Sequence, residues 1–185
     1  MRRRHWRTLV RGILISWLFG ARAVADTFPG CVTRVYAEDM KAKHVWHHSL
    51  RDLITQARPD LATLATLDMD QQLALMDRRQ AQFNYLVQVD PKRIHTREGL
   101  SSFRNFDWAQ TDALILRQRS LSYVVIERRV ADLARLTQGH PNRPALQDYF
   151  QSVLSVSPQF QGMVQRLGER ESDVEGLLQG CPPLR

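Results

Sequence analysis

Two cysteines, Cys31 and Cys181, are the residues best suited to covalent chemistry in this sequence of 185 residues. There is no C-x-x-C motif, and no neighbouring residues mark a reactive thiol, so a redox-active pair is not favoured. An even number of cysteines in an exported chain favours pairing. We predict a Cys31–Cys181 disulfide, which in the chain-entropy model removes about 5 kcal/mol of unfolded-state entropy. The alternative is an acylated lipoprotein cysteine at Cys31, which Phe28 and Pro29 fit poorly.

A second group with chemical potential is the histidine-rich stretch MKAKHVWHH. Met40, His44 and His47 share one flank of a predicted helix, while His44 and His48 are four residues apart and could bind one divalent ion. Imidazoles alone suit zinc or nickel, and a thioether with imidazoles suits copper. The simpler interpretation makes His47 a hydrogen-bonded histidine at the edge of the core and leaves the other two solvated. We therefore expect no cofactor, with a divalent or copper ion as the alternative.

The segment from Asp90 to Trp108, called here the connecting segment, mixes cations with aromatic residues. The segment shows little helical periodicity, so we interpret it as a connection between two predicted helices. It is unusually long for such a connection. Arginine with aromatic residues is the composition of binding hot spots. The alternative is that the aromatic side chains cap the core while the cations are solvated. We predict contact with an envelope protein or peptide, and the candidate residues are Arg93, Arg97, Phe103, Arg104, Phe106 and Trp108.

Catalytic motifs are missing from the sequence. It has no G-x-S-x-G, no H-E-x-x-H and no glycine-rich phosphate loop. Acidic pairs such as Glu38 and Asp39 are expected on exposed surfaces, where carboxylates are solvated. Arg117, Arg128 and Arg135 fall on one face of a predicted helix, where a solvated face is favoured over an anion site. The leading hypothesis is non-catalytic binding, and an exported all-α enzyme without a recognisable motif is an alternative.

The excess of positive charge is concentrated in residues 1–25. This stretch has a basic start, an apolar run and an Ala-x-Ala site, which is typical of a signal peptide cleaved between Ala25 and Asp26. Six of the 26 Lys and Arg residues lie there, so the other 20 nearly balance the 19 acidic residues. Nucleic-acid binding is therefore not expected. We predict a periplasmic protein, with secretion, twin-arginine export and an uncleaved amphipathic anchor as alternatives.

The apolar run of residues 12–21 has about half the length that a helix needs to cross a bilayer. No later stretch of the chain approaches that length, so we predict a soluble mature chain with no transmembrane segment. The sequence does not indicate an oligomeric state.

Helical periodicity runs through the remaining chain, with no period-two strand pattern. Three long amphipathic helices are predicted, over residues 31–57, from a capping box at Asp68 to the Asp90–Pro91 step, and from 107 or 111 to 138. The apolar arc of the third helix shifts partway along its length. Shorter helices are predicted over 146–156, 158–167 and 173–179. Residues 26–185 should thus form one all-α, bundle-like domain closed by the disulfide.

Overall fold

The structure, a computed structural model, describes residues 27–184. Helices account for most of this part of the chain, and it contains no strand. The predicted all-α, bundle-like fold is therefore confirmed. The helices are α1 (Phe28–Ala57), α2 (Ala62–Val89), α3 (Gly99–Arg104), α4 (Gln110–Arg119), α5 (Leu121–Gln138), α6 (Arg143–Tyr149) and α7 (Pro158–Gln179). Short 3₁₀ turns cover Pro59–Leu61 and Pro91–Arg93, and a π-helical turn covers Phe150–Leu154.

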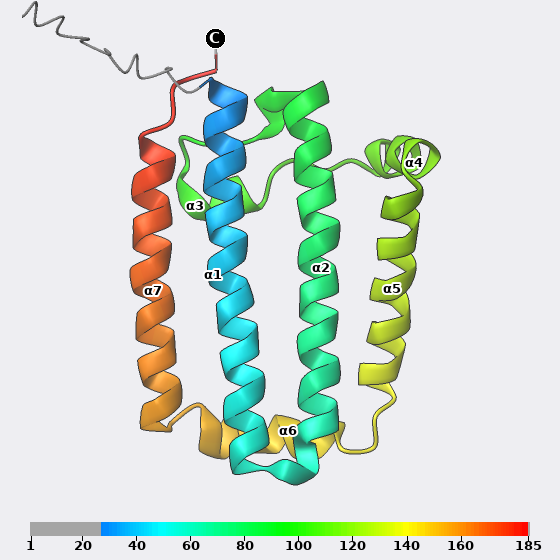
Figure 1. Cartoon of the computed structure of the whole chain (residues 1–185), viewed down its shortest axis with the longest axis vertical. Coiled ribbons are helices and arrows are strands. Elements are labelled where there is room, and N and C mark those ends of the chain that lie inside the picture. Colours follow the sequence, from blue (N-terminus) through cyan, green and yellow to red (C-terminus); the bar gives the residue numbers. More distant parts are fainter. Residues whose placement is uncertain (1–26, 185) are drawn as a thin grey trace, which may run out of the picture.

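The four long helices lie side by side in the order α7, α1, α2, α5 (Figure 1). α1 packs against α7 and α2, and α2 packs against α5. α3 packs on α7 and passes behind α1 in the view of Figure 1, while α6 lies across the opposite end of the row.

α1 begins three residues earlier than predicted. The Thr27 hydroxyl accepts a hydrogen bond from the Gly30 amide at 3.4 Å, and Pro29 occupies the first turn, where its missing N–H costs nothing. The helix ends at Ala57, as predicted, two residues before Pro59.

α2 begins at Ala62, so the predicted capping box at Asp68 is wrong. Leu64 and Ala65 are buried in the first turns, and their burial extends the helix by six residues beyond the predicted start. Asp68 lies within the helix, where burial raises the pKa of its carboxyl group.

The predicted third helix is two helices, α4 and α5, separated at Ser120. The Ser120 hydroxyl caps α5 by accepting a hydrogen bond from the Tyr123 amide at 3.2 Å. The shift of the apolar arc in the sequence marks this break, because α4 crosses the end of α5 in a different direction (Figure 1).

α7 is one continuous helix, although Gly168 and a capping box at Ser172 predicted two. Its buried residues Met163, Val174 and Leu178 face the neighbouring helices on both sides of the expected break. A glycine in a helix costs only about 1 kcal/mol relative to alanine, so packing along the whole length outweighs it.

The connecting segment contains α3, which the sequence did not predict. Gly99 starts this helix with a φ of 86°, a conformation that favours glycine. The next amide, of Leu100, donates a hydrogen bond to Glu175 of α7 at 2.6 Å. This contact ties the connecting segment to the last long helix.

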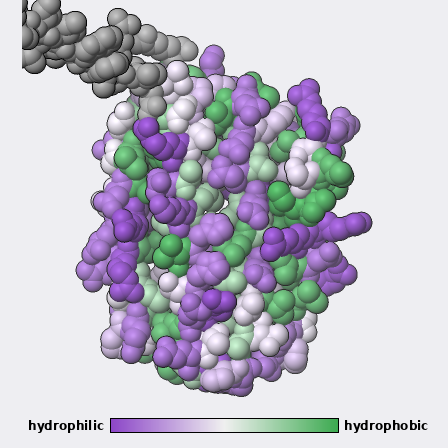
Figure 2. Space-filling model, viewed as in Figure 1, coloured by the Kyte–Doolittle hydropathy of each residue, from purple (hydrophilic) through white to green (hydrophobic). Residues whose placement is uncertain are grey.

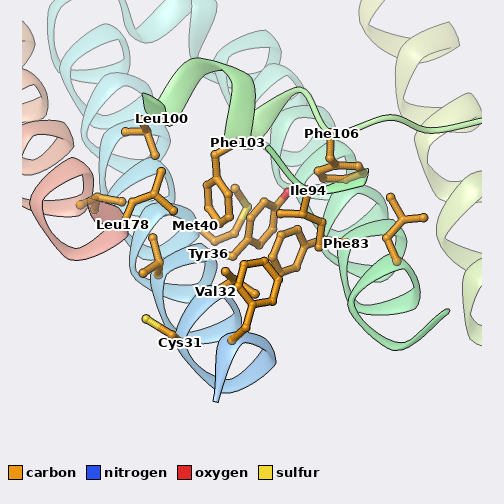
Figure 3. Packing of buried hydrophobic residues seen from close by; sticks show 14 of the residues in the cluster. Cys31, Val32, Tyr36, Met40, Phe83, Ile94, Leu100, Phe103, Phe106 and Leu178 are labelled. Atoms are coloured by element: carbon orange, nitrogen blue, oxygen red, sulfur yellow. The ribbon is translucent and has the colours of Figure 1, made fainter. Parts of the chain in front are cut away.

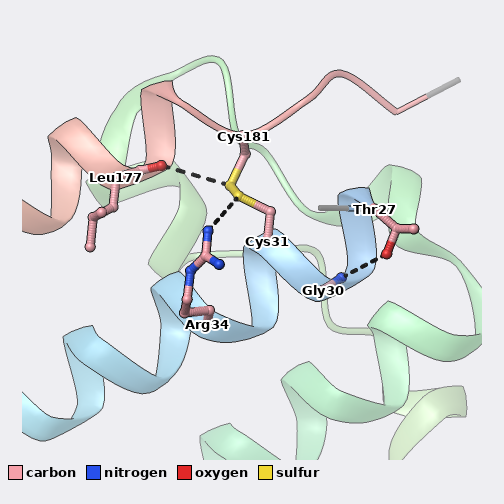
Figure 4. Close-up of a disulfide and its surroundings, with 6 residues drawn as sticks. All are labelled: Thr27, Gly30, Cys31, Arg34, Leu177 and Cys181. Atoms are coloured by element: carbon pink, nitrogen blue, oxygen red, sulfur yellow. Dashed lines mark hydrogen bonds between the residues drawn. A yellow bond between two sulfur atoms is a disulfide. The ribbon is translucent and has the colours of Figure 1, made fainter. Parts of the chain in front are cut away.

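The Cys31–Cys181 disulfide is present and links the start of α1 to the residues after α7 (Figure 4). The two Cα atoms lie 5.6 Å apart and are separated by 150 residues in the sequence. Arg34 places a guanidinium nitrogen 3.9 Å from the Cys31 sulfur. The bond therefore closes the described chain into a loop and fixes α7 beside α1.

Candidate functional site

Two aromatic side chains of the connecting segment, those of Phe103 and Phe106, point into the core (Figure 3). Phe103 and Phe106 are 0% and 3% exposed, and their ring centroids lie 5.5–6.3 Å from those of Tyr36 in α1 and Phe83 in α2. Two of the three aromatic residues assigned to partner binding are thus part of the hydrophobic core. Their side chains are not available to a partner while this segment stays in place.

Of the remaining candidates in the segment, some contact other residues of the chain and one is exposed to solvent. Trp108 is half-buried and packs edge-on against Tyr85 with 5.9 Å between centroids. Arg93 forms an ion pair with Asp112 at 2.6 Å, and this guanidinium holds the pKa of the Asp112 carboxyl below its usual value. Arg97 is exposed. Of the residues predicted to bind a partner, Arg97 is the most accessible.

Arg104, the last candidate of this set, forms an ion pair with a fully buried carboxylate, Asp39 of α1. Its Nε and Nη2 atoms lie 2.5–3.1 Å from the two Asp39 oxygens, and Nη2 also lies 2.7 Å from Glu171 of α7. Lys43 adds a third cationic contact to Asp39 at 2.9 Å. The prediction that Asp39 is a solvated surface carboxylate is wrong, because the residue is 0% exposed.

The burial of Asp39 is indicated in the sequence by its spacing from apolar residues. Asp39 is seven residues after Val32 and three after Tyr36, which is the spacing of a single helix face. Val32 and Tyr36 are both buried. An acidic residue in register with an apolar face predicts a buried ion pair, because an isolated buried charge is too costly.

A pocket of about 440 Å³ lies between α1, α2 and α3, and we call it the cationic pocket. Its lining includes the cations Lys43, Arg78, Arg79 and Arg104, together with His47. Burial lowers the pKa of the Lys43 ammonium group, while the Asp39 carboxylate raises it. Such a concentration of positive charge around a cavity attracts anions.

A second pocket of about 490 Å³ lies between α1 and α7, and we call it the apolar groove. Val45 and Leu177 on its walls are 63% and 45% exposed, while Trp46 packs edge-on against Phe160 at 5.7 Å. The other apolar lining residues are Ala42, Met163, Leu167 and Val174, and the charged ones are Glu38, Lys41, Arg166, Arg170 and Asp173. An open apolar concavity beside a tryptophan has the character of a binding site for an apolar side chain.

Exposed apolar residues also gather where α4 meets α5, on the right-hand side of the view in Figure 2. The most exposed is Leu121, at 80%. This surface, called here the α4–α5 patch, consists of Leu114, Ile115, Leu121, Val124 and Val125.

The structure places the predicted metal ligands in two pairs along α1. The rings of His44 and His48 lie 6.5 Å apart, and His47 faces the cationic pocket. Met40 is buried and, like His47, borders the cationic pocket. Within residues 27–184, no group of three or more His, Cys, Asp or Glu side chains is arranged to hold a metal ion. The metal hypothesis therefore gains no further ligand from the fold.

The predicted arginine row is partly neutralised by carboxylates. Arg117 pairs with Glu127 at 2.6 Å, and Arg135 forms an ion pair with Asp132 one turn away. Arg128 is exposed on α5. Because Arg117 lies on α4 and the other two arginines lie on α5, the three do not share the face of one helix as predicted, and their surroundings are solvent and salt bridges.

The predicted signal-cleavage residues, Ala25 and Asp26, lie outside the described residues. In the described part of the chain, no helix has the length and apolar character needed to cross a membrane. With known proteins the chain shows no match: neither a family model, nor a curated protein, nor a solved structure is similar to it.

Proposed function

We propose that the protein is an exported periplasmic protein that acts by non-catalytic binding to an envelope protein or peptide, and that a helical segment of this partner binds in the apolar groove. The observation that carries the proposal is the groove itself, an open concavity between two long helices with exposed apolar walls.

The proposed location rests on two features. Residues 1–25 have the pattern of a signal peptide, and the Cys31–Cys181 disulfide suits an oxidising compartment. Envelope proteins are the partners that such a compartment offers.

A helix is the occupant that the shape of the groove favours. α1 and α7 lie side by side along their lengths, and side chains spaced three or four residues apart on a third helix can fill the depression between them. Val45 and Leu177 would lose exposed apolar surface on binding, at roughly 25 cal/mol for each Å² buried. The half-buried Trp46 would supply the rigid anchor that is common in binding hot spots.

The charges at the rim indicate the polar side of this partner. Glu38 is paired with Lys41, and Arg170 with Asp173, each at 3.7 Å. Arg166 is exposed and leaves the rim with one excess positive charge. The expected ligand is therefore an amphipathic helix with acidic residues on the flank that faces Arg166.

The proposal is tested by selecting amphipathic peptides from a displayed library against the full chain labelled with 5-fluorotryptophan. Selected peptides should carry acidic residues, and they should move the ¹⁹F resonance of Trp46, which is assigned by its loss in Trp46→Phe. The resonance of Trp108, which packs against Tyr85 and does not line the groove, should stay in place. Val45→Glu should weaken binding about tenfold or more, because it puts a charge on an apolar wall.

The matched control is Leu121→Glu, the same kind of change at an exposed position on the α4–α5 patch. It should leave peptide binding unchanged. Binding that survives Val45→Glu but is lost in Leu121→Glu would move the site to that patch, and a shift confined to Trp108 would move it to the connecting segment. Failure to select any peptide would reject peptide binding.

A further inference from the structure

The cationic pocket holds more positive charge than its own carboxylates neutralise. Arg104 and Lys43 share Asp39, and Arg104 also contacts Glu171. The contacts of Arg79 are with neutral groups. Four cations therefore surround the pocket, and two carboxylates lie in contact with two of them, while Glu127 of α5 lies within electrostatic range of Arg78. This excess persists in a partly buried place, where charge is costly without a counter-ion.

Arg79 is the cation that the fold holds most firmly without an anionic partner. Its guanidinium group stacks on the Phe106 ring, 3.9 Å from the centroid, and donates to the Arg104 carbonyl at 2.9 Å and to Gln82 at 3.3 Å. These bonds use two of its five N–H donors. Burial lowers the pKa of this guanidinium, as does neighbouring Arg78. The remaining donors are thus oriented but not occupied by a protein carboxylate.

The Arg104 side chain in the lining of the pocket is also fixed. Asp39 is fully buried and holds Arg104 by two of its guanidinium nitrogens, so the position of that side chain is set before any ligand enters. A preorganised set of donors binds an anion more tightly than mobile side chains do, because little side-chain freedom is lost on binding.

We propose that the cationic pocket is a binding site for a small molecule with a phosphate or carboxylate group. Arg79 and Arg78 contact the anionic group from α2, and Lys43 and Arg104 provide positive charge from the opposite side. Planar guanidinium groups match the oxygens of phosphate and carboxylate, which accept two parallel N–H bonds.

The rest of the pocket defines the body of the ligand. Its volume of about 440 Å³ lies within the range of small-molecule sites. The accessible part of its lining is more polar than apolar, because Tyr36 and Met76 are only 1% and 8% exposed, while Gln72 contributes an amide. A compact organic molecule that carries the anionic group fills this volume better than a bare inorganic ion. This site is independent of the apolar groove, which lies on the opposite flank of α1.

The test measures the binding of phenyl phosphate, benzoate and inorganic phosphate to the full chain by calorimetry, with the side-chain Nε–Hε signals of arginine followed by NMR. We expect saturable binding of phenyl phosphate or benzoate with a shift of the Arg79 signal, and weaker binding of inorganic phosphate. The stronger of the two aromatic probes identifies the anionic group as phosphate or carboxylate.

Arg79→Gln and Arg78→Gln should each weaken this binding about tenfold, the loss expected for one charge-assisted contact. Arg78→Gln serves if the loss of the Arg79 stack on Phe106 unfolds the chain. The matched control is Arg128→Gln, which removes one exposed arginine from α5 and should have no effect. Equal weakening by all three variants, or no saturable binding of any probe, would overturn the proposal.

Discussion

The two flanks of α1 face different surroundings. Lys43 and His47 point toward α2 and the connecting segment, where aromatic rings, the Asp39 ion pairs and the cationic pocket lie. Glu38 and Val45 lie about half a helical turn away and border the apolar groove, which no described segment covers. The first flank, called here the covered flank, is held by specific contacts. The second, called here the open flank, is exposed to solvent.

Composition alone favours the connecting segment as the binding site, whereas the structure leaves the apolar groove accessible. The connecting segment has the arginines and aromatic residues of a hot spot, yet it uses Phe103, Phe106 and Arg104 to close the core. The groove is lined by residues such as Val45 and Leu177, which look ordinary in the sequence. Hot-spot chemistry therefore indicates binding only when the fold leaves it unpaired, and in this protein the fold pairs most of it.

The largest difference in stability between the two flanks is expected when an aromatic residue is removed from the covered flank. Phe103→Ala should lower the free energy of unfolding by about 4 kcal/mol, since it opens a cavity beside Tyr36 and Phe83. Val45→Ala on the open flank should change it by less than about 0.5 kcal/mol, because the side chain is mostly solvated. Urea unfolding measures both. A similar loss in the two variants would mean that the flanks do not differ in stability.

The sequence was sufficient for the features that local patterns determine. Helical periodicity predicted the all-α fold, Pro59 and the Asp90–Pro91 step predicted the ends of α1 and α2, and the cysteines predicted the disulfide. The start of α2 and the continuity of α7 were missed, because tertiary burial outweighs weak local signals such as Asp68 and Gly168.

The candidate sites were harder to predict, because they depend on which residues of distant segments meet. Arg104 and Asp39 are 65 residues apart, and nothing in the local sequence pairs them. Arg79 lies in the middle of α2, where an arginine is usually solvated. The groove is a property of the space between α1 and α7, so it requires knowledge of which helices are neighbours. Only the position of Asp39 in an apolar face could have been read in advance.

Breaking the ion pairs of the covered flank should lower the free energy of unfolding by a smaller amount than Phe103→Ala does. Asp39→Asn should lower the free energy of unfolding by about 3 kcal/mol, because it leaves Lys43 and Arg104 partly buried without their shared carboxylate. The matched control is Asp132→Asn, which breaks an exposed pair with Arg135 and should cost less than about 1 kcal/mol. The comparison fails if Asp39→Asn costs no more than its control.

The smallest expected effect is a dependence of stability on pH that comes from the covered flank. Burial lowers the pKa of His47 below its usual value of 6.5, and His44, Lys43 and His48 lower it further. The unfolded chain then binds this proton more readily than the folded chain, so the free energy of unfolding falls as pH drops below about 6.5. Well above that pH the histidine is neutral in both states and its contribution is constant.

His47→Gln should therefore reduce the loss of stability between about pH 7.5 and pH 5.5 in urea unfolding, since glutamine does not titrate. His48→Gln, at an exposed position one residue along, should leave the loss close to that of the unaltered chain. The two variants distinguish the effect of burying His47 from the effect of the number of histidines on α1. An equal reduction in both would show that charge repulsion among the histidines, rather than burial beside the cationic pocket, sets the pH dependence.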